Sequence, residues 1–202
     1  MWQLAVPIAL IVIVGLVAYF LLRPATEPAP AGPTARACPA AAPVLVSDIQ
    51  VPAGPVEGYC QTQLVNAAEI ILAADHFTSD IRAKQIGVMT AIGESSLNNL
   101  GYGDAAGPDS RGLFQQRSNY GSIAARMDPY TAASAFFQRM MGVANWTTLP
   151  PTEVAHTVQI NANPNYYTPY FSKAVKIVNA LLLDRLPPSF QTIPTSPPAL
   201  RP

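Results

Sequence analysis

The sequence predicts a mainly α-helical domain with a small turn-rich or β lobe, preceded by one transmembrane helix. Apolar residues recur every three to four positions through most of residues 61–96 and 130–183, which is the period of an amphipathic helix. Residues 98–119 lack this period and are dense in Gly, Asn, Asp and Ser, which favours turns. Residues 2–22 carry no charge and consist mostly of Ile, Val, Leu and Ala.

The uncharged N-terminal run is long enough to cross a bilayer, because about twenty apolar residues at ~1.5 Å per residue span a hydrocarbon core of ~30 Å. A cleavable signal peptide is the alternative, with Ala35-Arg36-Ala37 as a candidate cleavage site. However, no Lys or Arg precedes the run, and the run is longer than the apolar part of a typical signal peptide. We therefore expect residues 1–23 to form an uncleaved, single-pass anchor.

Three further segments follow the anchor. Residues 24–58 are rich in Pro and Ala and predict a semi-rigid spacer, whose apolar runs at 44–46 and 49–51 are expected to lie against the domain surface. Residues 59–184 contain the helical periodicity and form the predicted domain. Residues 185–202 are again rich in Pro and predict a disordered tail.

The two cysteines, Cys38 and Cys60, flank a short segment just before the domain. An even pair in a chain with an export-type segment predicts a disulfide and an oxidising, extracytoplasmic setting, with two free thiols as the alternative. Arg23, the only basic residue beside the anchor, favours the opposite orientation under the positive-inside rule. Because a single Arg biases topology weakly, we expect the domain on the extracytoplasmic side of the cell membrane.

The composition argues against several kinds of partner. Charged residues make up 12% of the 202 residues and the formal net charge is zero, so no basic run is available to neutralise nucleic-acid phosphates. The two cysteines and the two histidines, His76 and His156, do not have the spacing of a metal site. We expect no nucleic acid, no metal and no organic cofactor.

The first two helices of the domain have recognisable boundaries. The first covers residues 61–76, and its apolar face consists of Leu64, Ala67, Ala68, Ile71 and Leu72. Thr78-Ser79-Asp80 is an N-cap cluster for the second helix, which runs into Glu94.

The remaining elements follow the same reasoning. Residues 98–119 predict turns with a small hairpin. Asp128-Pro129 combines an N-cap with Pro at the first helical position. The three helices expected from there on cover residues 130–143, 148–160 and 167–183.

Glu94 ends the second helix, in the sequence Ile92-Gly93-Glu94-Ser95-Ser96. A Glu at such a place is often a solvated residue of the helix end, and this interpretation stays open. Two features favour a functional acid instead: the preceding helix is nearly uncharged for three turns, and the negative end of the helix dipole disfavours a carboxylate. Both raise the pKa of a carboxyl group and keep it protonated, as a general acid requires.

Polar residues of the following loop have two interpretations each. Asp104, in Gly101-Tyr102-Gly103-Asp104, is either an ordinary turn residue or a second carboxylate across a cleft. Asp109 lies in a surface turn pattern, and Gln115 and Gln116 also fit a half-buried strand. The aromatic residues that either pack in the core or line a sugar cleft are Tyr102, Tyr120, Trp146, Tyr166, Tyr167 and Tyr170.

Three segments, taken in order, resemble goose-type lysozymes and soluble lytic transglycosylases. That family has a helix ending in Glu-Ser, then Gly-aromatic-Gly-Asp, then Gly-Leu-Met-Gln; here the corresponding segments are residues 92–96, 101–104 and 112–115. Residues 112–117 (GLFQQR) are also similar to lysozyme-like domains of exported wall hydrolases of high-GC Gram-positive bacteria and their phages. The resemblance covers residues 60–183 and implies a lysozyme-like helical fold.

The resemblance also implies roles for individual residues. Glu94 matches the catalytic acid and Asp104 the first aspartate of the cleft, and Phe114 and Gln115 match the Met-Gln of the cleft wall. The other residues expected at the substrate are Ser95, Tyr102, Gln116, Gln159, Asn161 and Tyr166.

Two positions depart from the family pattern. Goose-type lysozymes have a second Asp two residues after the motif Gln, where this chain has Arg117. The family's Tyr-Asn-Ala-Gly corresponds to Ile160-Asn161-Ala162-Asn163, so the Tyr hydroxyl is missing at that position. A lytic transglycosylase needs only one acid/base, because the sugar's own 6-hydroxyl attacks, so both this reaction and hydrolysis stay open.

The resemblance implies cleavage of the β-1,4 bond between N-acetylmuramic acid and N-acetylglucosamine in peptidoglycan, with Glu94 as the single general acid. The alternative is a non-catalytic peptidoglycan-binding or assembly protein of a secretion, conjugation or phage apparatus, which the departures at Arg117 and Ile160 favour. A membrane-anchored helical adaptor without sugar chemistry is a third interpretation.

Overall fold

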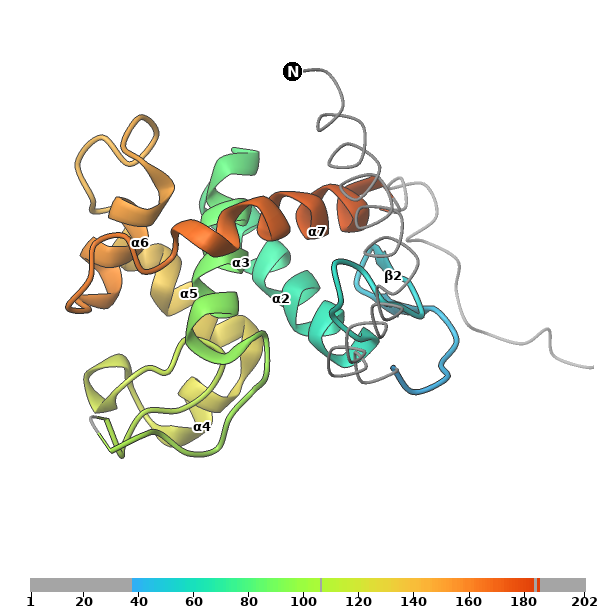
Figure 1. Ribbon diagram of the computed structural model, residues 1–202, viewed down its shortest axis with the longest axis horizontal. Coiled ribbons are helices and arrows are strands. Elements are labelled where there is room, and N and C mark those ends of the chain that lie inside the picture. The colour runs from blue at the N-terminus through green and yellow to red at the C-terminus, as the bar shows by residue number, and fades with distance from the viewer. Residues whose placement is uncertain (1–37, 106, 184, 186–202) are drawn as a thin grey trace, which may run out of the picture. The chain divides into compact units, whose positions relative to one another are not determined.

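The computed structural model describes residues 38–105, 107–183 and 185, and over these residues the chain is mainly helical (Figure 1). The predicted anchor over 1–23 lies outside the described residues, as do residues 24–37 of the spacer and the tail from 186 onward. In the part of the chain that the structure describes, no helix combines the length and the apolarity needed to cross a bilayer. The elements are β1 (Val44–Val46), β2 (Ile49–Val51), α2 (Gln61–Phe77), α3 (Ile81–Ser95), the 3-10 turn η1 (Ser118–Tyr120), α4 (Ile123–Met127), α5 (Pro129–Met140), α6 (Pro151–Gln159), η2 (Thr168–Tyr170) and α7 (Phe171–Leu183).

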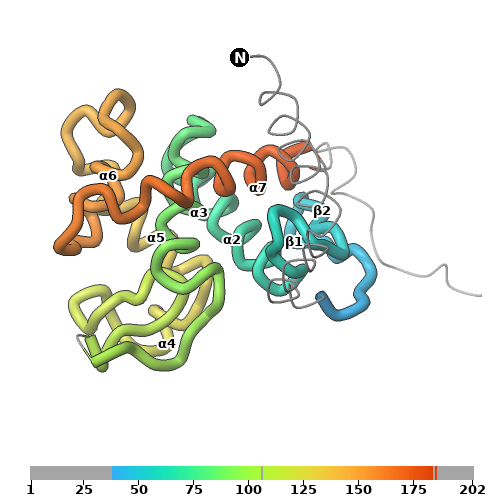
Figure 2. The backbone as a smooth tube through the Cα atoms, viewed as in Figure 1, coloured from blue at the N-terminus to red at the C-terminus, as the bar shows by residue number. Residues whose placement is uncertain are grey.

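Helices α2 and α3 lie at the centre of the domain. Helix α2 packs along α5, and α3 contacts α2, α7 and α6 (Figure 2). The apolar faces of these helices meet in one core, in which Leu64, Ile86, Met89, Phe136 and Phe137 are fully buried. The buried apolar face of α3 extends to Ile92, two residues before Glu94.

The predicted helix starts are confirmed by their capping hydrogen bonds. Asp80 accepts a hydrogen bond from the backbone nitrogen of Arg82 at 2.9 Å, and Asp128 accepts one from Thr131 at 2.8 Å. Each side chain satisfies a backbone N–H that has no partner within the helix. Pro129 occupies the first turn of α5, where no backbone donor is needed.

Residues 44–51 form an antiparallel hairpin, in contrast to the spacer expected over 24–58. Ile49 and Val51 point to the same side and are fully buried, while Gln50 between them is exposed. An alternation of apolar and polar residues over only three positions is too short to indicate a strand within a Pro/Ala-rich stretch. The two strands are stabilised by the burial of β2 against α2 and α7. Arg185, placed in the tail by the sequence, forms an ion pair with Asp48 of this hairpin.

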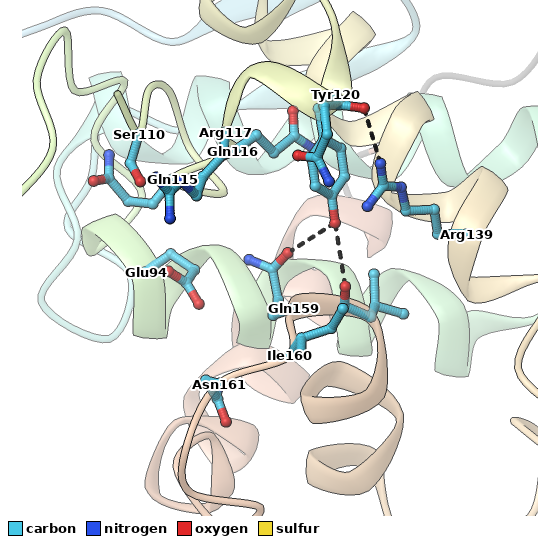
Figure 3. A pocket seen from close by; sticks show the side chains of 12 residues that line it. Glu94, Ser110, Gln115, Gln116, Arg117, Tyr120, Arg139, Gln159, Ile160 and Asn161 are labelled. Carbon is cyan, nitrogen blue, oxygen red and sulfur yellow. Dashed lines mark hydrogen bonds between the residues drawn. The ribbon is translucent and has the colours of Figure 1, made fainter. Parts of the chain in front are cut away.

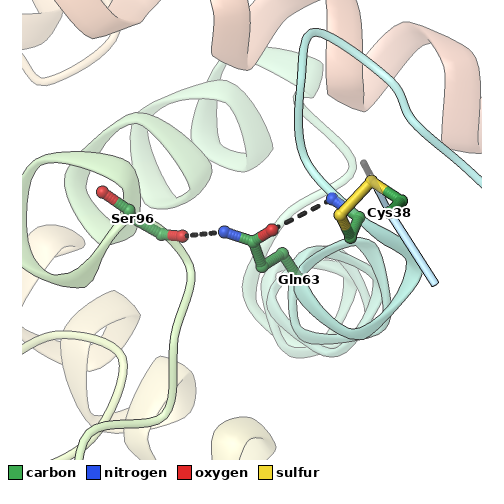
Figure 4. Close-up of a disulfide and its surroundings, with 4 residues drawn as sticks. Cys38, Gln63 and Ser96 are labelled. Atoms are coloured by element: carbon green, nitrogen blue, oxygen red, sulfur yellow. Dashed lines mark hydrogen bonds between the residues drawn. A yellow bond between two sulfur atoms is a disulfide. The ribbon is translucent and has the colours of Figure 1, made fainter. Parts of the chain in front are cut away.

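The disulfide between Cys38 and Cys60 is confirmed (Figure 4). Cys60 is the N-cap of α2, and its backbone nitrogen donates to the side-chain oxygen of Gln63 at 3.0 Å. The amide nitrogen of the same Gln63 donates to the backbone oxygen of Ser96 at 2.7 Å. The start of α2 is therefore connected to the turn that directly follows the catalytic candidate on α3.

The loop between α3 and α4 contains two isolated bridges, Leu100 with Gly112 and Arg111 with Gln116, where a small hairpin was expected. The buried guanidinium of Arg126 supports this loop by donating to the backbone oxygens of Asp109 at 2.6 Å and Gln116 at 3.0 Å. Arg126 belongs to α4, which the sequence does not predict because five residues are too few to show a helical period.

Candidate active site

Glu94 lies in the last turn of α3, at the point where two hollows in the surface meet. The first hollow, of about 310 Å³, is lined by Glu94 together with Gln116, Arg117, Tyr120, Arg139, Gln159 and Asn161. The second hollow, of about 510 Å³, is lined by Glu94 together with Tyr102, Asp104, Gln115, Gln159 and Tyr166. Both volumes lie within the usual range for ligand sites. In Figure 3, Glu94 and Gln159 lie next to each other, with Gln115 and Gln116 of the loop above them.

The carboxyl group of Glu94 has a raised pKa. Burial against the apolar end of α3 is the main cause, because it disfavours the charged form, and the negative charge of Asp104 raises the pKa further. Hydrogen bonds from Tyr167 and Gln159 act in the opposite direction and offset part of the increase. Glu94 thus holds its proton at a higher pH than an ordinary Glu does, as the sequence predicts.

Tyr167 fixes the direction of this carboxyl group. Its hydroxyl donates to Oε1 of Glu94, and its ring is fully buried. Burial and the neighbouring Glu94 raise the pKa of Tyr167, so its hydroxyl stays protonated and available as a donor. The ring can lie here because Gly93 has no side chain: a Cβ atom at that position would be 2.7 Å from Cδ1 of Tyr167.

Gln159, at the end of α6, is held from two sides. Its amide nitrogen donates to the backbone oxygen of Phe114 at 2.8 Å, and its side-chain oxygen is 3.5 Å from the hydroxyl of Tyr120. The Tyr120 hydroxyl also donates to the backbone oxygen of Val158 at 3.2 Å (Figure 3). These contacts fix the amide beside Glu94, so α3, α6 and the loop before α4 all position the same carboxyl group.

Asp104 lies on the second hollow together with Glu94, and its side chain is exposed. Its Oδ1 accepts a hydrogen bond from the backbone nitrogen of Gly107 at 2.8 Å, which is typical of an Asp in a turn. The turn interpretation and the cleft interpretation of Asp104 are therefore both compatible with its position. Tyr102, beside it, is 67% exposed.

The structure brings most of the predicted site residues to the two hollows. Those that line a hollow with Glu94 are Tyr102, Asp104, Gln115, Gln116, Gln159, Asn161 and Tyr166. Phe114 differs from its expected place in the cleft wall: its ring is fully buried and stacks on Phe136, with 4.8 Å between ring centroids. Ser95 is also buried, and its hydroxyl donates to the backbone oxygen of Leu113 at 2.8 Å, which joins α3 to the loop.

Several lining residues have no role in the sequence-based prediction. Ser110, Asn119, Arg139 and Val158 line the first hollow, and the hydroxyl of Tyr167 donates to Glu94. Tyr120 and Tyr167 are among the aromatic residues for which the sequence leaves core and cleft open. In the sequence, Arg139 is an ordinary basic residue in the last turn of α5. Only the folded structure shows that its side chain reaches this site.

Replacing Tyr167 with Phe is expected to raise the pKa of Glu94 and to lower the activity. The hydroxyl stabilises the carboxylate form of Glu94, so its loss favours the protonated form. A general acid must be protonated, so the basic limb of the pH profile of kcat/KM should move to higher pH. Tyr166→Phe is the control, because that hydroxyl donates to the backbone oxygen of Gly93 instead. An unchanged basic limb in Tyr167→Phe would contradict this role.

No family model matches the chain, and no curated protein matches it at a significant level. The chemistry of the site, a hydrogen-bonded carboxyl group with a raised pKa in a polar cleft, is therefore the basis for assigning a function.

Proposed function

We propose that the domain cleaves the glycan strand of peptidoglycan, at the β-1,4 bond between N-acetylmuramic acid and N-acetylglucosamine, in the manner of goose-type lysozymes and lytic transglycosylases. The observation that carries this proposal is the environment of Glu94. A carboxyl group with a raised pKa, held by Tyr167 and Gln159 where two hollows meet, has the properties of a general acid for a glycosidic bond.

In the proposed reaction, Glu94 donates its proton to the glycosidic oxygen as the bond from that oxygen to the anomeric carbon of muramic acid breaks. The leaving sugar departs with a new hydroxyl group, and positive charge develops on the remaining ring. Either a water molecule or the 6-hydroxyl of the same sugar then attacks the anomeric carbon, and the Glu94 carboxylate accepts the proton that the attacking oxygen loses.

The lining of the two hollows supports a sugar polymer as the substrate. The amide side chains of Gln115, Gln159 and Asn161 offer both donors and acceptors, which suit the hydroxyl and acetamido groups of amino sugars. The exposed rings of Tyr102 and Tyr166 offer flat apolar surfaces on the second hollow. Because both hollows are lined by Glu94, the site has room for more than one sugar unit beside the acid.

The Cys38–Cys60 disulfide supports an extracytoplasmic location, because such bonds persist in oxidising compartments. Peptidoglycan lies in the same setting. With the predicted anchor over residues 1–23, the domain would act on the wall from the outer face of the cell membrane.

Digestion of purified sacculi by the purified protein tests the proposed function directly. We expect soluble fragments whose masses report either a reducing muramic acid or its 1,6-anhydro form. Release of no fragment by the wild-type protein, under conditions in which a known muramidase digests the same sacculi, would reject the enzymatic proposal.

Replacing Asp104 with Asn separates the two versions of the reaction. If Asp104 orients the attacking water, hydrolysis should fall by about 10²-fold or more, because general-base assistance is worth at least that much. If the 6-hydroxyl attacks, the loss should be small and anhydro products should persist. An unchanged rate with only reducing-end products would contradict both versions.

Non-catalytic binding of peptidoglycan is the second candidate function. It is favoured by Arg117, which occupies the place of the family's second aspartate and is paired with Asp109 at 2.8 Å. Pelleting of the wild-type protein with sacculi, without any release of fragments, would favour this candidate.

A further inference from the structure

We propose that a side hollow next to the active site binds the peptide stem of the substrate, and that Arg139 binds a carboxylate of this stem. This inference rests on the proposed function and concerns the part of the substrate that branches from the glycan strand. The side hollow, of about 430 Å³, is lined by Arg139 together with Val143, Ala144, Thr157, Val158 and Ile160.

Arg139 links the side hollow to the catalytic cleft. It lines the first hollow together with Glu94 and also lines the side hollow, as do Val158 and Ile160. In Figure 3 its guanidinium lies beyond Tyr120, on the side away from Glu94. A substrate that fills the first hollow can therefore extend a branch past Arg139 without leaving the surface.

Two contacts fix the orientation of the Arg139 guanidinium, which favours binding of an anion. It stacks on the ring of Tyr120, 3.4 Å from the centroid, and donates to the backbone oxygen of Asn119 at 3.1 Å. A guanidinium carries five N–H groups. A guanidinium that stacking already holds in place loses little entropy when it binds a carboxylate. Among the described residues, no carboxylate lies within ion-pair distance of Arg139, whereas Arg117 already has Asp109.

Ile160 presents an exposed apolar side chain where the first hollow and the side hollow adjoin. Its side chain is 82% exposed, and its backbone lies in the left-handed region at φ 54°, which is an outlier for a β-branched residue. This conformation ends α6, where the backbone nitrogen of Ile160 donates to the backbone oxygen of His156 at 2.7 Å. An apolar side chain at the boundary between two hollows would be covered by a bound branch.

The chemistry of peptidoglycan matches these features. The stem is attached through the lactyl group of muramic acid, the sugar whose glycosidic bond Glu94 would protonate, so it leaves the strand close to the reacting centre. Stem peptides combine small apolar side chains with carboxylates, which suits a small apolar hollow with one cation. Phosphates of wall teichoic acids carry the same sign of charge, and the experiment includes them as a competing ligand.

The experiment compares stem-bearing glycan with glycan from which an amidase has removed the stems, using the full-length protein. We expect wild type to cleave the stem-bearing glycan with a higher kcat/KM than the stem-free glycan. Arg139→Gln should lower the ratio of these two kcat/KM values by roughly tenfold, because it removes one charge-assisted hydrogen bond. Lys176→Gln removes the same charge from the exposed face of α7 and should leave both rates unchanged. Melting temperatures show whether each variant is folded.

Direct binding of a free stem tetrapeptide decides the inference without any cleavage assay. We expect wild type to bind the tetrapeptide by calorimetry and Arg139→Gln to bind it roughly tenfold more weakly. Ile160→Asn, which tolerates the left-handed backbone, should weaken binding while the melting temperature stays the same or rises.

The outcomes separate this inference from the proposed function. Equal affinity of wild type and Arg139→Gln for the tetrapeptide, or stronger binding of oligomeric glycerol phosphate than of the tetrapeptide, would overturn the stem subsite. Cleavage of both glycans with the same ratio in wild type and Arg139→Gln would overturn it as well, while leaving the proposed function intact. If neither glycan is cleaved, the proposed function fails, and the binding measurement still decides the subsite.

Discussion

Replacing Glu94 with Gln is expected to reduce glycan cleavage by roughly 10²–10⁴-fold, the usual contribution of a general acid. The amide has nearly the same size and can still accept the hydrogen bond from the Tyr167 hydroxyl, but it has no proton to transfer. The measurement is the release of labelled fragments from sacculi. A variant with wild-type turnover would exclude Glu94 as the acid and remove the basis of the proposed function.

The thermal stability of the same variant provides a second measurement. The folded protein raises the pKa of Glu94, so the folded state binds the proton more tightly than the unfolded chain. This tighter proton binding stabilises the folded protein at pH values below the pKa that Glu94 has in the unfolded chain. The stabilisation is lost as the pH rises through the pKa that Glu94 has in the folded protein. At pH 7 we therefore expect Glu94→Gln to be at least as stable as wild type. Glu153→Gln, on the exposed side of α6, is the matched control for activity.

Replacing Gly93 with Ala is expected to cause the second largest loss of activity, although Gly93 carries no reacting group. The new methyl group would lie 2.7 Å from one carbon of the buried Tyr167 ring and 3.0 Å from the next. Because the ring has no free space, it must move and take its hydroxyl away from Glu94. Overpacking of this kind costs about 1–3 kcal/mol of stability, and a misplaced catalytic group costs roughly 10²-fold in rate.

Gly101→Ala is the matched control for this substitution, because a Cβ atom there would meet nothing within 4 Å. Turnover of sacculi and the melting temperature should be measured for both variants. A Gly93→Ala protein that is as active and as stable as Gly101→Ala would show that the contact between Tyr167 and Glu94 does not matter.

The sequence predicts the helices of this domain because their signals are local. Asp80 and Asp128 lie next to the backbone groups that they cap, and the apolar faces repeat over several turns. The hairpin at residues 44–51 could not be found in this way. Its stability comes from the burial of Ile49 and Val51 against helices distant in the chain, and the Pro/Ala-rich composition around it favours a spacer.

The candidate site shows the same limit. Glu94 and the loop after it are close in sequence, so a pattern over about twenty residues was enough to indicate them. Tyr167 is 73 residues away from Glu94, and only the packing of α7 and η2 on α3 brings its hydroxyl to the carboxyl group. For Phe114, the sequence pattern predicts a position next to the cleft but not the direction of the side chain. The ring points into the core instead, where it stacks on Phe136.

The pairing between Arg185 and the hairpin determines how the domain would respond to mechanical force. Ile49 pairs with Arg185, Arg185 forms an ion pair with Asp48, and Cys38 is bonded to the start of α2. Both ends of the described domain thus join it beside β2 and the end of α7, away from α6 (Figure 1). Tension between these ends would stretch the ion pair and the hairpin, and it would bypass α6 and the loop that line the cleft. A pull on the two ends of the described domain would therefore load the hairpin and the end of α7 before it reached the contacts around Glu94.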